Sequence, residues 1–145
     1  MSRKVLLADE SDIMRAAMRQ ILAVEPSIEI VGEAQSFLEA IQMVADIKPE
    51  VLLYDLYLPE GRNFAPDFVR ALLRSVPHTL VLSLSNDPEA KALAAGYGAE
   101  ALLDKRNLSG NMIPAIMNCC VHHMVPKAST LRRITFHTKY RSPIG

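Results

Sequence analysis

VLLYD, at residues 51–55, is a run of four apolar residues that ends in an acid. A run this short and this continuously apolar is typical of a strand that is buried on both faces of a sheet. The loop that follows contains Pro59 and Gly61, which mark a turn. We therefore predict a buried strand with Asp55 at its end.

Similar apolar runs occur on both sides of this strand, and longer amphipathic segments separate them. The predicted strands are 5–8, 28–31, 51–54, 80–82 and 101–103, and the predicted helices are 13–24, 36–48, 66–74, 88–95 and 109–123. Pro114, inside the last helix, is tolerable only in its early turns. Alternation of this kind predicts an α/β fold, a doubly wound five-stranded parallel sheet with helices on both faces.

The chain of 145 residues is long enough for one domain with a proper core. Its net charge is zero, but residues 1–104 hold sixteen acids and nine bases, whereas residues 105–145 hold seven bases and no acid. We predict one domain over residues 1–124 and a basic tail or linker over residues 125–145. Such a tail is either a solvated linker or a nucleic-acid-binding segment, and it is too short to fold as a domain.

The adjacent cysteines Cys119 and Cys120 do not suggest a disulfide framework. The sequence shows no signal peptide and no apolar run of the roughly 20 residues that a membrane span needs. These features predict a cytoplasmic protein that does not enter a membrane.

Polar side chains follow four of the predicted strands. Asp9 and Glu10 end the first strand, Asp55 the third, Ser83 the fourth and Lys105 the fifth. In an open parallel sheet, functional groups gather at the carboxyl ends of the strands. Taken alone, each of these residues is more simply a helix cap or a surface charge, but together they predict a site.

Clustered carboxylates repel one another, and a hard cation such as Mg²⁺ relieves that repulsion. Such a cation would also neutralise charge on an incoming phosphoryl group. Asp55 is the best placed nucleophile, because a carboxylate can form an acyl phosphate. Lys105 and Ser83 can then bind the transferred oxygens.

With these residues in place, residues 3–123 resemble the receiver domain of two-component response regulators. The resemblance rests on the acidic pair Asp9-Glu10, the segment 55–59, the hydroxyl of Ser83, and Gly98-Ala99 followed by Lys105. The stretches 5–10 and 23–34 are most similar to the subfamily that carries a helix-turn-helix output domain.

The resemblance implies a flavodoxin-like fold and a sensor histidine kinase as the phosphoryl donor. It implies that Asp9, Glu10, Asp55 and the backbone carbonyl of Tyr57 hold Mg²⁺, and that Asp55 is the phosphoacceptor. It further implies that phosphorylation shifts the surface formed by the fourth helix, fifth strand and fifth helix, through which a homodimer can form. DNA would be bound only by an output domain outside this chain, and catalysis would be limited to the domain's own phosphoryl transfer and hydrolysis.

The sequence departs from the family pattern at four positions. Glu10 stands where Asp is usual, Leu84 follows the hydroxyl residue where a small side chain is preferred, and Leu102 occupies a position that is often aromatic. Gly61 lies one residue later than the usual glycine. A degenerate receiver that binds partners without phosphorylation therefore stays an alternative. A phosphatase is a third reading, but the segment after Asp55 lacks the second Asp that one such class needs.

Cysteine and histidine also gather near the end of the last predicted helix, at Cys119, Cys120, His122 and His123. Only residues three or four apart share a helix face, so Cys119 can pair with one of the two histidines. Zinc needs more converging ligands than such a pair supplies. The sequence therefore predicts no zinc site on this helix.

Overall fold

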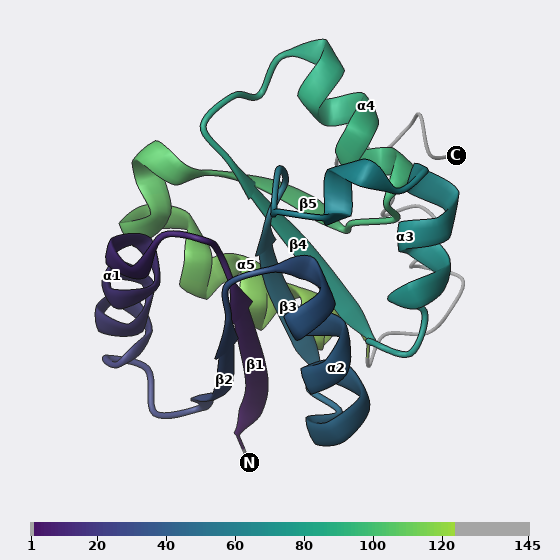
Figure 1. The fold of residues 1–145 in the computed structure, drawn as a ribbon. Coiled ribbons are helices and arrows are strands. Elements are labelled where there is room, and N and C mark those ends of the chain that lie inside the picture. Colours follow the sequence, from purple (N-terminus) through teal and green to yellow (C-terminus); the bar gives the residue numbers. More distant parts are fainter. Residues whose placement is uncertain (1, 124–145) are drawn as a thin grey trace.

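Strands and helices alternate along the described part of the chain, residues 2–123, in a computed structural model (Figure 1). The strands are β1 (Arg3–Ala8), β2 (Ile28–Ala34), β3 (Val51–Asp55), β4 (His78–Ser83) and β5 (Ala101–Asp104). The helices are α1 (Asp12–Leu22), α2 (Phe37–Ile47), α3 (Pro66–Leu72), α4 (Pro88–Gly96) and α5 (Leu108–His123), with short 3₁₀ turns η1 (Gly61–Asn63) and η2 (Lys105–Asn107).

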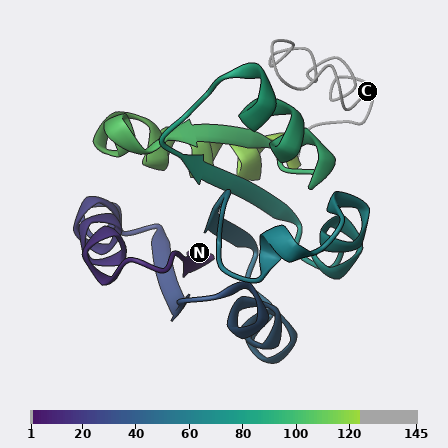
Figure 2. The same ribbon diagram turned by 45° about the horizontal axis from the view of Figure 1, so that its top comes forward.

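The five strands form one sheet in the order β2-β1-β3-β4-β5, and every neighbouring pair is parallel. This order is that of flavodoxin-like folds, in which ligands bind at the carboxyl ends of the central strands. Helices α1 and α5 cover one face of the sheet, and α2, α3 and α4 cover the other (Figures 1 and 2). The predicted doubly wound fold is confirmed.

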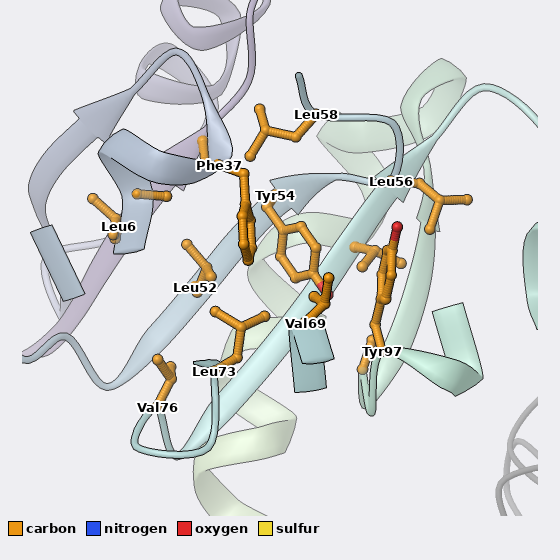
Figure 3. Packing of buried hydrophobic residues seen from close by; sticks show 14 of the residues in the cluster. Leu6, Phe37, Leu52, Tyr54, Leu56, Leu58, Val69, Leu73, Val76 and Tyr97 are labelled. Carbon is orange, nitrogen blue, oxygen red and sulfur yellow. The ribbon is translucent and has the colours of Figure 1, made fainter. Parts of the chain in front are cut away.

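The sheet separates two apolar cores, and alternate residues of each inner strand belong to each. In β3, Leu52 and Tyr54 enter the core beneath α2, α3 and α4 (Figure 3), whereas Val51 and Leu53 enter the core beneath α1 and α5. Burial on both faces explains why the run 51–54 is continuously apolar. Each such side chain contributes roughly 1.5–3 kcal/mol when it is fully buried.

Polar side chains cap the starts of three helices. The Ser11 hydroxyl accepts a hydrogen bond from the Met14 amide at 3.1 Å, and the Asp87 carboxylate accepts one from the Ala90 amide at 2.8 Å. Ser36 caps α2 in the same way, by accepting from the Glu39 amide at 3.2 Å. These side chains satisfy amide groups that have no partner within the first helical turn.

Several predicted boundaries were wrong by a few residues. Strand β2 continues to Ala34 and β4 begins at His78, because backbone pairing with β1 and β3 extends beyond the apolar runs. Helix α1 ends at Leu22 and α3 at Leu72, so both are shorter than predicted. Pro114 lies in the second turn of α5.

None of the helices in the described residues is long and apolar enough to cross a membrane. The predicted basic tail at 125–145 lies outside the described residues.

Candidate functional site

Two acids and one lysine meet at the carboxyl edge of the sheet. Asp9 follows β1 directly, Asp55 is the last residue of β3, and Lys105 is the first residue after β5. The Lys105 Nζ atom lies 2.7 Å from Asp9 Oδ2 and 3.0 Å from Asp55 Oδ1. One ammonium group therefore bridges two carboxylates that come from different strands.

Little water reaches these charges. The side chains of Asp9, Lys105 and Asp55 are 3%, 9% and 17% exposed. Burial raises the pKa of Asp55, and the neighbouring charge of Asp9 acts in the same direction, against the hydrogen bond from Lys105. Burial also disfavours the charged form of Lys105, but its hydrogen bonds to both carboxylates outweigh this and raise its pKa.

Ser83 ends β4, the strand that lies between those of Asp55 and Lys105. The Ser83 side chain is buried, and its Oγ accepts a hydrogen bond from the Ser85 amide at 3.0 Å. This contact uses an oxygen lone pair and leaves the hydroxyl proton available as a donor. Leu84, the next residue, is 65% exposed and directs its side chain to solvent.

Glu10 and Tyr57 lie on the two loops beside Asp9 and Asp55. Glu10 is exposed, and within the described part of the chain its carboxylate has no hydrogen bond or ion pair. The Tyr57 amide donates a hydrogen bond to the Asp55 carboxylate, and the Leu58 amide donates to the Asp55 carbonyl at 3.0 Å. This tight turn keeps the backbone of Tyr57 beside Asp55.

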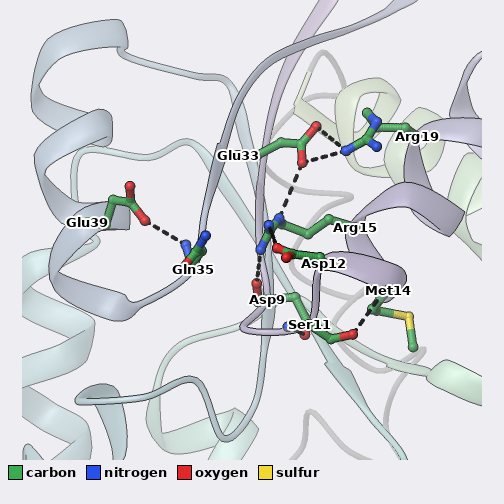
Figure 4. Close-up of polar contacts among 9 residues, drawn as sticks. All are labelled: Asp9, Ser11, Asp12, Met14, Arg15, Arg19, Glu33, Gln35 and Glu39. Carbon is green, nitrogen blue, oxygen red and sulfur yellow. Dashed lines mark hydrogen bonds and ion pairs between the residues drawn. The ribbon is translucent and has the colours of Figure 1, made fainter.

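Arg15, which was not among the predicted site residues, holds the Asp9 loop in place (Figure 4). Its buried guanidinium donates a 2.7 Å hydrogen bond to the Asp9 carbonyl and a 3.2 Å bond to Glu33, and it also contacts Asp12. Glu33 in turn pairs with Arg19 at 2.7 Å. The available signal was the position of Arg15 on the apolar face of α1, three residues before the fully buried Met18.

The donor set fits a small divalent cation. Asp9 and Asp55 carry more negative charge than Lys105 balances, and Glu10 adds a third carboxylate on the exposed side. Hard oxygen donors of this kind suit Mg²⁺, which keeps several of its waters and therefore needs few protein ligands. Asp9, Asp55 and Glu10 are thus the residues that would hold it.

The family positions that differ in this chain have clear places in the structure. Leu102 is partly buried and packs against the core beneath α2, α3 and α4. Tyr97 is a buried aromatic residue of the same core, and its ring centroid lies 6.1 Å from that of Tyr54. Gly98 has φ +80°, which favours glycine, and a side chain there would meet Arg70. Glu60, just before Gly61, also has a positive φ of 75°.

Comparison with known proteins shows which family the chain resembles. Residues 5–117 match the family model of the response regulator receiver domain. The chain is 34% identical over 105 residues to the uncharacterized transcriptional regulatory protein YhcZ of Bacillus subtilis, a match that covers 70% of this chain and 48% of that protein. It is 32% identical over 104 residues to the DNA-binding transcriptional activator DevR/DosR of Mycobacterium tuberculosis, a match that covers 70% of this chain and 47% of that protein.

A third relative is an enzyme. The protein-glutamate methylesterase/protein-glutamine glutaminase of Pyrococcus abyssi is 31% identical over 109 residues, with 73% of this chain and 29% of that protein covered. The chain thus spans less than half the length of these curated relatives.

Solved structures show the same fold. The receiver domain of the putative response regulator NarL from Mycobacterium tuberculosis superposes with a TM-score of 0.72 at 24% identity, covering 81% of this chain and 95% of that one. The response regulator domain of Thermotoga maritima CheB gives a TM-score of 0.72 at 20% identity, and the match covers 87% of this chain and 100% of that one. With a family match over most of its length and this fold, the chain belongs to the response-regulator receiver domains of two-component systems.

Proposed function

We propose that this domain is a phosphorylation-controlled switch in which Asp55 accepts a phosphoryl group from a sensor histidine kinase. The observation that carries the proposal is the Lys105 ammonium, which bridges Asp9 and Asp55 at the carboxyl edge of the sheet. This arrangement supports the proposal, because a carboxylate that can act as a nucleophile lies beside a positive charge and a second carboxylate. Bound Mg²⁺, held by Asp9, Asp55, Glu10 and the Tyr57 carbonyl, would offset the charge of the phosphoryl oxygens.

In this reaction an Asp55 carboxylate oxygen forms a bond to phosphorus while the bond from phosphorus to the donor histidine nitrogen breaks. Lys105 has three N–H donors, so it can keep its contact with Asp9 while it binds a transferred oxygen. The Ser83 hydroxyl accepts from the Ser85 amide and can donate its own proton to another oxygen. The raised pKa of Asp55 means that cancelling nearby negative charge makes its nucleophilic, ionised form more available.

The output of the switch would be the surface formed by α4, β5 and α5. Ser83 ends β4 and Lys105 follows β5, so a change in their contacts can alter this surface. We infer a homodimer through this surface and control of transcription by a DNA-binding domain outside this chain, since two relatives are described as transcriptional regulators. A cytoplasmic location is part of the same proposal.

Two departures from the family pattern favour a second function. Leu102 stands at the family position that is often aromatic, and Glu10 stands where Asp is usual. A domain that binds its partners without phosphorylation would need neither the aromatic switch residue nor the usual acidic pair.

Intact-mass measurement after incubation with acetyl phosphate separates the two functions. The phospho-switch predicts a mass gain of one phosphoryl group that requires Mg²⁺ and is absent from Asp55→Asn. Asp46→Asn, an exposed position on α2, is the matched control and should behave as wild type. If the folded protein gains no mass from acetyl phosphate or from a sensor kinase, the phosphorylation-independent module becomes the better reading.

A further inference from the structure

Three side chains with metal-binding atoms meet far from Asp55. His78 is the first residue of β4, Glu100 immediately precedes β5, and Cys119 lies on α5. One potential ligand atom from each residue lies within 4.8 Å of the other two. His78 and Glu100 lie at the amino ends of their strands, so this cluster is at the edge of the sheet opposite the phosphoacceptor site.

The backbone fixes the positions of these residues. The His78 amide donates to the Glu50 carbonyl at 3.1 Å, and the Glu100 amide donates to the Thr79 carbonyl at 2.8 Å. His78 Nδ1 lies 2.6 Å from Glu100 Oε2. Cys119 is buried one turn after Ile116, which is itself part of the core beneath α1 and α5. The three groups are thus held together by sheet pairing and helix packing.

An imidazole nitrogen, a carboxylate oxygen and a thiolate sulfur are the donors that zinc uses in proteins. Zinc–ligand bonds of about 2.0–2.3 Å in a tetrahedral site put ligand atoms roughly 3–4 Å apart. The observed separations of 2.6 Å to at most 4.8 Å bracket that range, so small side-chain rotations suffice. The charges of one thiolate and one carboxylate also balance Zn²⁺.

The burial pattern suits a site with one open position. His78 and Cys119 are buried, whereas the Glu100 side chain is 36% exposed. Because Glu100 is partly exposed, the cluster is open to solvent on that side, and we expect water as the fourth ligand.

We propose that His78, Glu100 and Cys119 form a Zn²⁺-binding site that ties β4, the start of β5 and α5 together. Binding releases the Cys119 thiol proton to solvent, and also the imidazole proton of any His78 that is charged. This inference does not depend on phosphorylation of Asp55. It differs from the expectation of no zinc site on the last helix, because two of the potential ligands come from distant segments. The side chains of residues 120–123 lie outside the described residues.

Titration of the metal-free full chain with Co²⁺, followed by displacement with Zn²⁺, tests the site. A thiolate-to-cobalt charge-transfer band should appear at stoichiometric Co²⁺ and disappear on addition of Zn²⁺. Cys119→Ser should abolish the band, and Cys120→Ser is the matched control that should retain it. Glu100→Gln, at the most exposed ligand, should weaken Zn²⁺ binding by at least about tenfold, the lower range seen for supporting residues of metal sites. Circular dichroism establishes that each variant is folded.

Several results would overturn the proposal. Absence of the band in the folded wild type would mean that the three residues form a hydrogen-bonded cluster without metal. A band that survives in Cys119→Ser, or is lost in Cys120→Ser, would place the thiolate elsewhere. Co²⁺ binding that gives no thiolate band and is lost in Asp55→Asn would place the cation at the carboxylate site. Failure of phosphorylation, by contrast, would leave the zinc titration unchanged, so the two proposals are tested separately.

Discussion

The ammonium nitrogen of Lys105 lies 3.0 Å from Asp55 Oδ1, although Asp55 ends β3 and Lys105 follows β5. Strand β4 lies between β3 and β5, so the lysine reaches across the end of β4 to make this contact. A second carboxylate, that of Asp9, binds the same nitrogen from β1. The contact is therefore part of the charge balance of the whole carboxyl edge.

Replacing Lys105 with methionine tests this balance. The two carboxylates would lose their shared cation, so we expect the pKa of Asp55 to rise further and the free energy of unfolding at neutral pH to fall by about 1–3 kcal/mol. The loss should shrink in acid, where both carboxylates are protonated. Carboxyl-carbon NMR titration and urea denaturation measure the two effects.

Lys91→Met is the control for this substitution. Lys91 lies on α4 and makes no ion pair with any residue in the described range, so its replacement should leave the pKa of Asp55 unchanged. Equal effects of the two substitutions would show that overall charge, and not the Lys105 contact, sets the pKa.

The raised pKa of Asp55 predicts a pH dependence of stability. Between the ordinary carboxyl pKa of about 4 and the raised value, the folded protein holds a proton that the unfolded chain has released. The native state binds more protons there, so stability falls as pH rises through this interval. The Asp55→Asn variant has no carboxyl group at this position, so its stability should not fall in this interval. Without Mg²⁺ the variant should therefore be more stable than wild type at pH 7 but not in acid.

Urea denaturation across that pH range, with and without Mg²⁺, measures this difference. Since Mg²⁺ favours the ionised carboxylate, its addition should stabilise wild type and have a smaller effect on Asp55→Asn. A stability difference between the proteins that stays constant with pH would contradict the raised pKa.

The main features of the fold, and the residues that meet at the carboxyl edge of the sheet, could be predicted from the sequence. The continuous apolar run 51–54 reports burial on both faces, and the order of strands then brings the groups at their ends to one edge. Asp9, Asp55 and Lys105 could be predicted because each lies at the carboxyl end of a strand or directly after it. Their roles in phosphoryl transfer stay predictions.

Other features depend on contacts between distant segments, which local patterns do not report. The Cys119 cluster needs His78 and Glu100 from two other elements, and the Arg15 contact needs Glu33 from β2. The positive φ angles at Lys48 and Glu60 could not be predicted from the sequence either, since neither residue type favours such angles. Glu60 has this conformation directly before Gly61, where the glycine of the family pattern is displaced by one residue.

Arg15→Gln should destabilise the fold through the Asp9 loop. The buried guanidinium binds the Asp9 carbonyl and Glu33, and loss of these charged hydrogen bonds should cost about 2–3 kcal/mol. Arg19→Gln is the matched control, because Arg19 binds the same Glu33 from a half-exposed position. It should cost at most about 1 kcal/mol. Chemical denaturation compares them, and equal losses would show that the Asp9 contact contributes little.

Substitution of Glu10 distinguishes an effect on Mg²⁺ binding from an effect on the stability of the fold. Its exposed carboxylate has no hydrogen bond or ion pair within residues 2–123, so Glu10→Gln should change the free energy of unfolding in the absence of Mg²⁺ by less than about 0.5 kcal/mol. The same change removes one of three carboxylates from the proposed Mg²⁺ site. Since ligand charge sets the affinity of such sites, we expect roughly tenfold weaker binding.

Calorimetric titration with Mg²⁺ measures that affinity, and Glu10→Asp completes the comparison. Aspartate keeps the charge and shortens the side chain by one methylene, so it should bind Mg²⁺ at least as well as wild type. If Glu10→Gln binds Mg²⁺ like wild type, then Glu10 is not a ligand and the site rests on Asp9 and Asp55. If Glu10→Asp binds much more tightly, the longer side chain is what limits the affinity of the natural site.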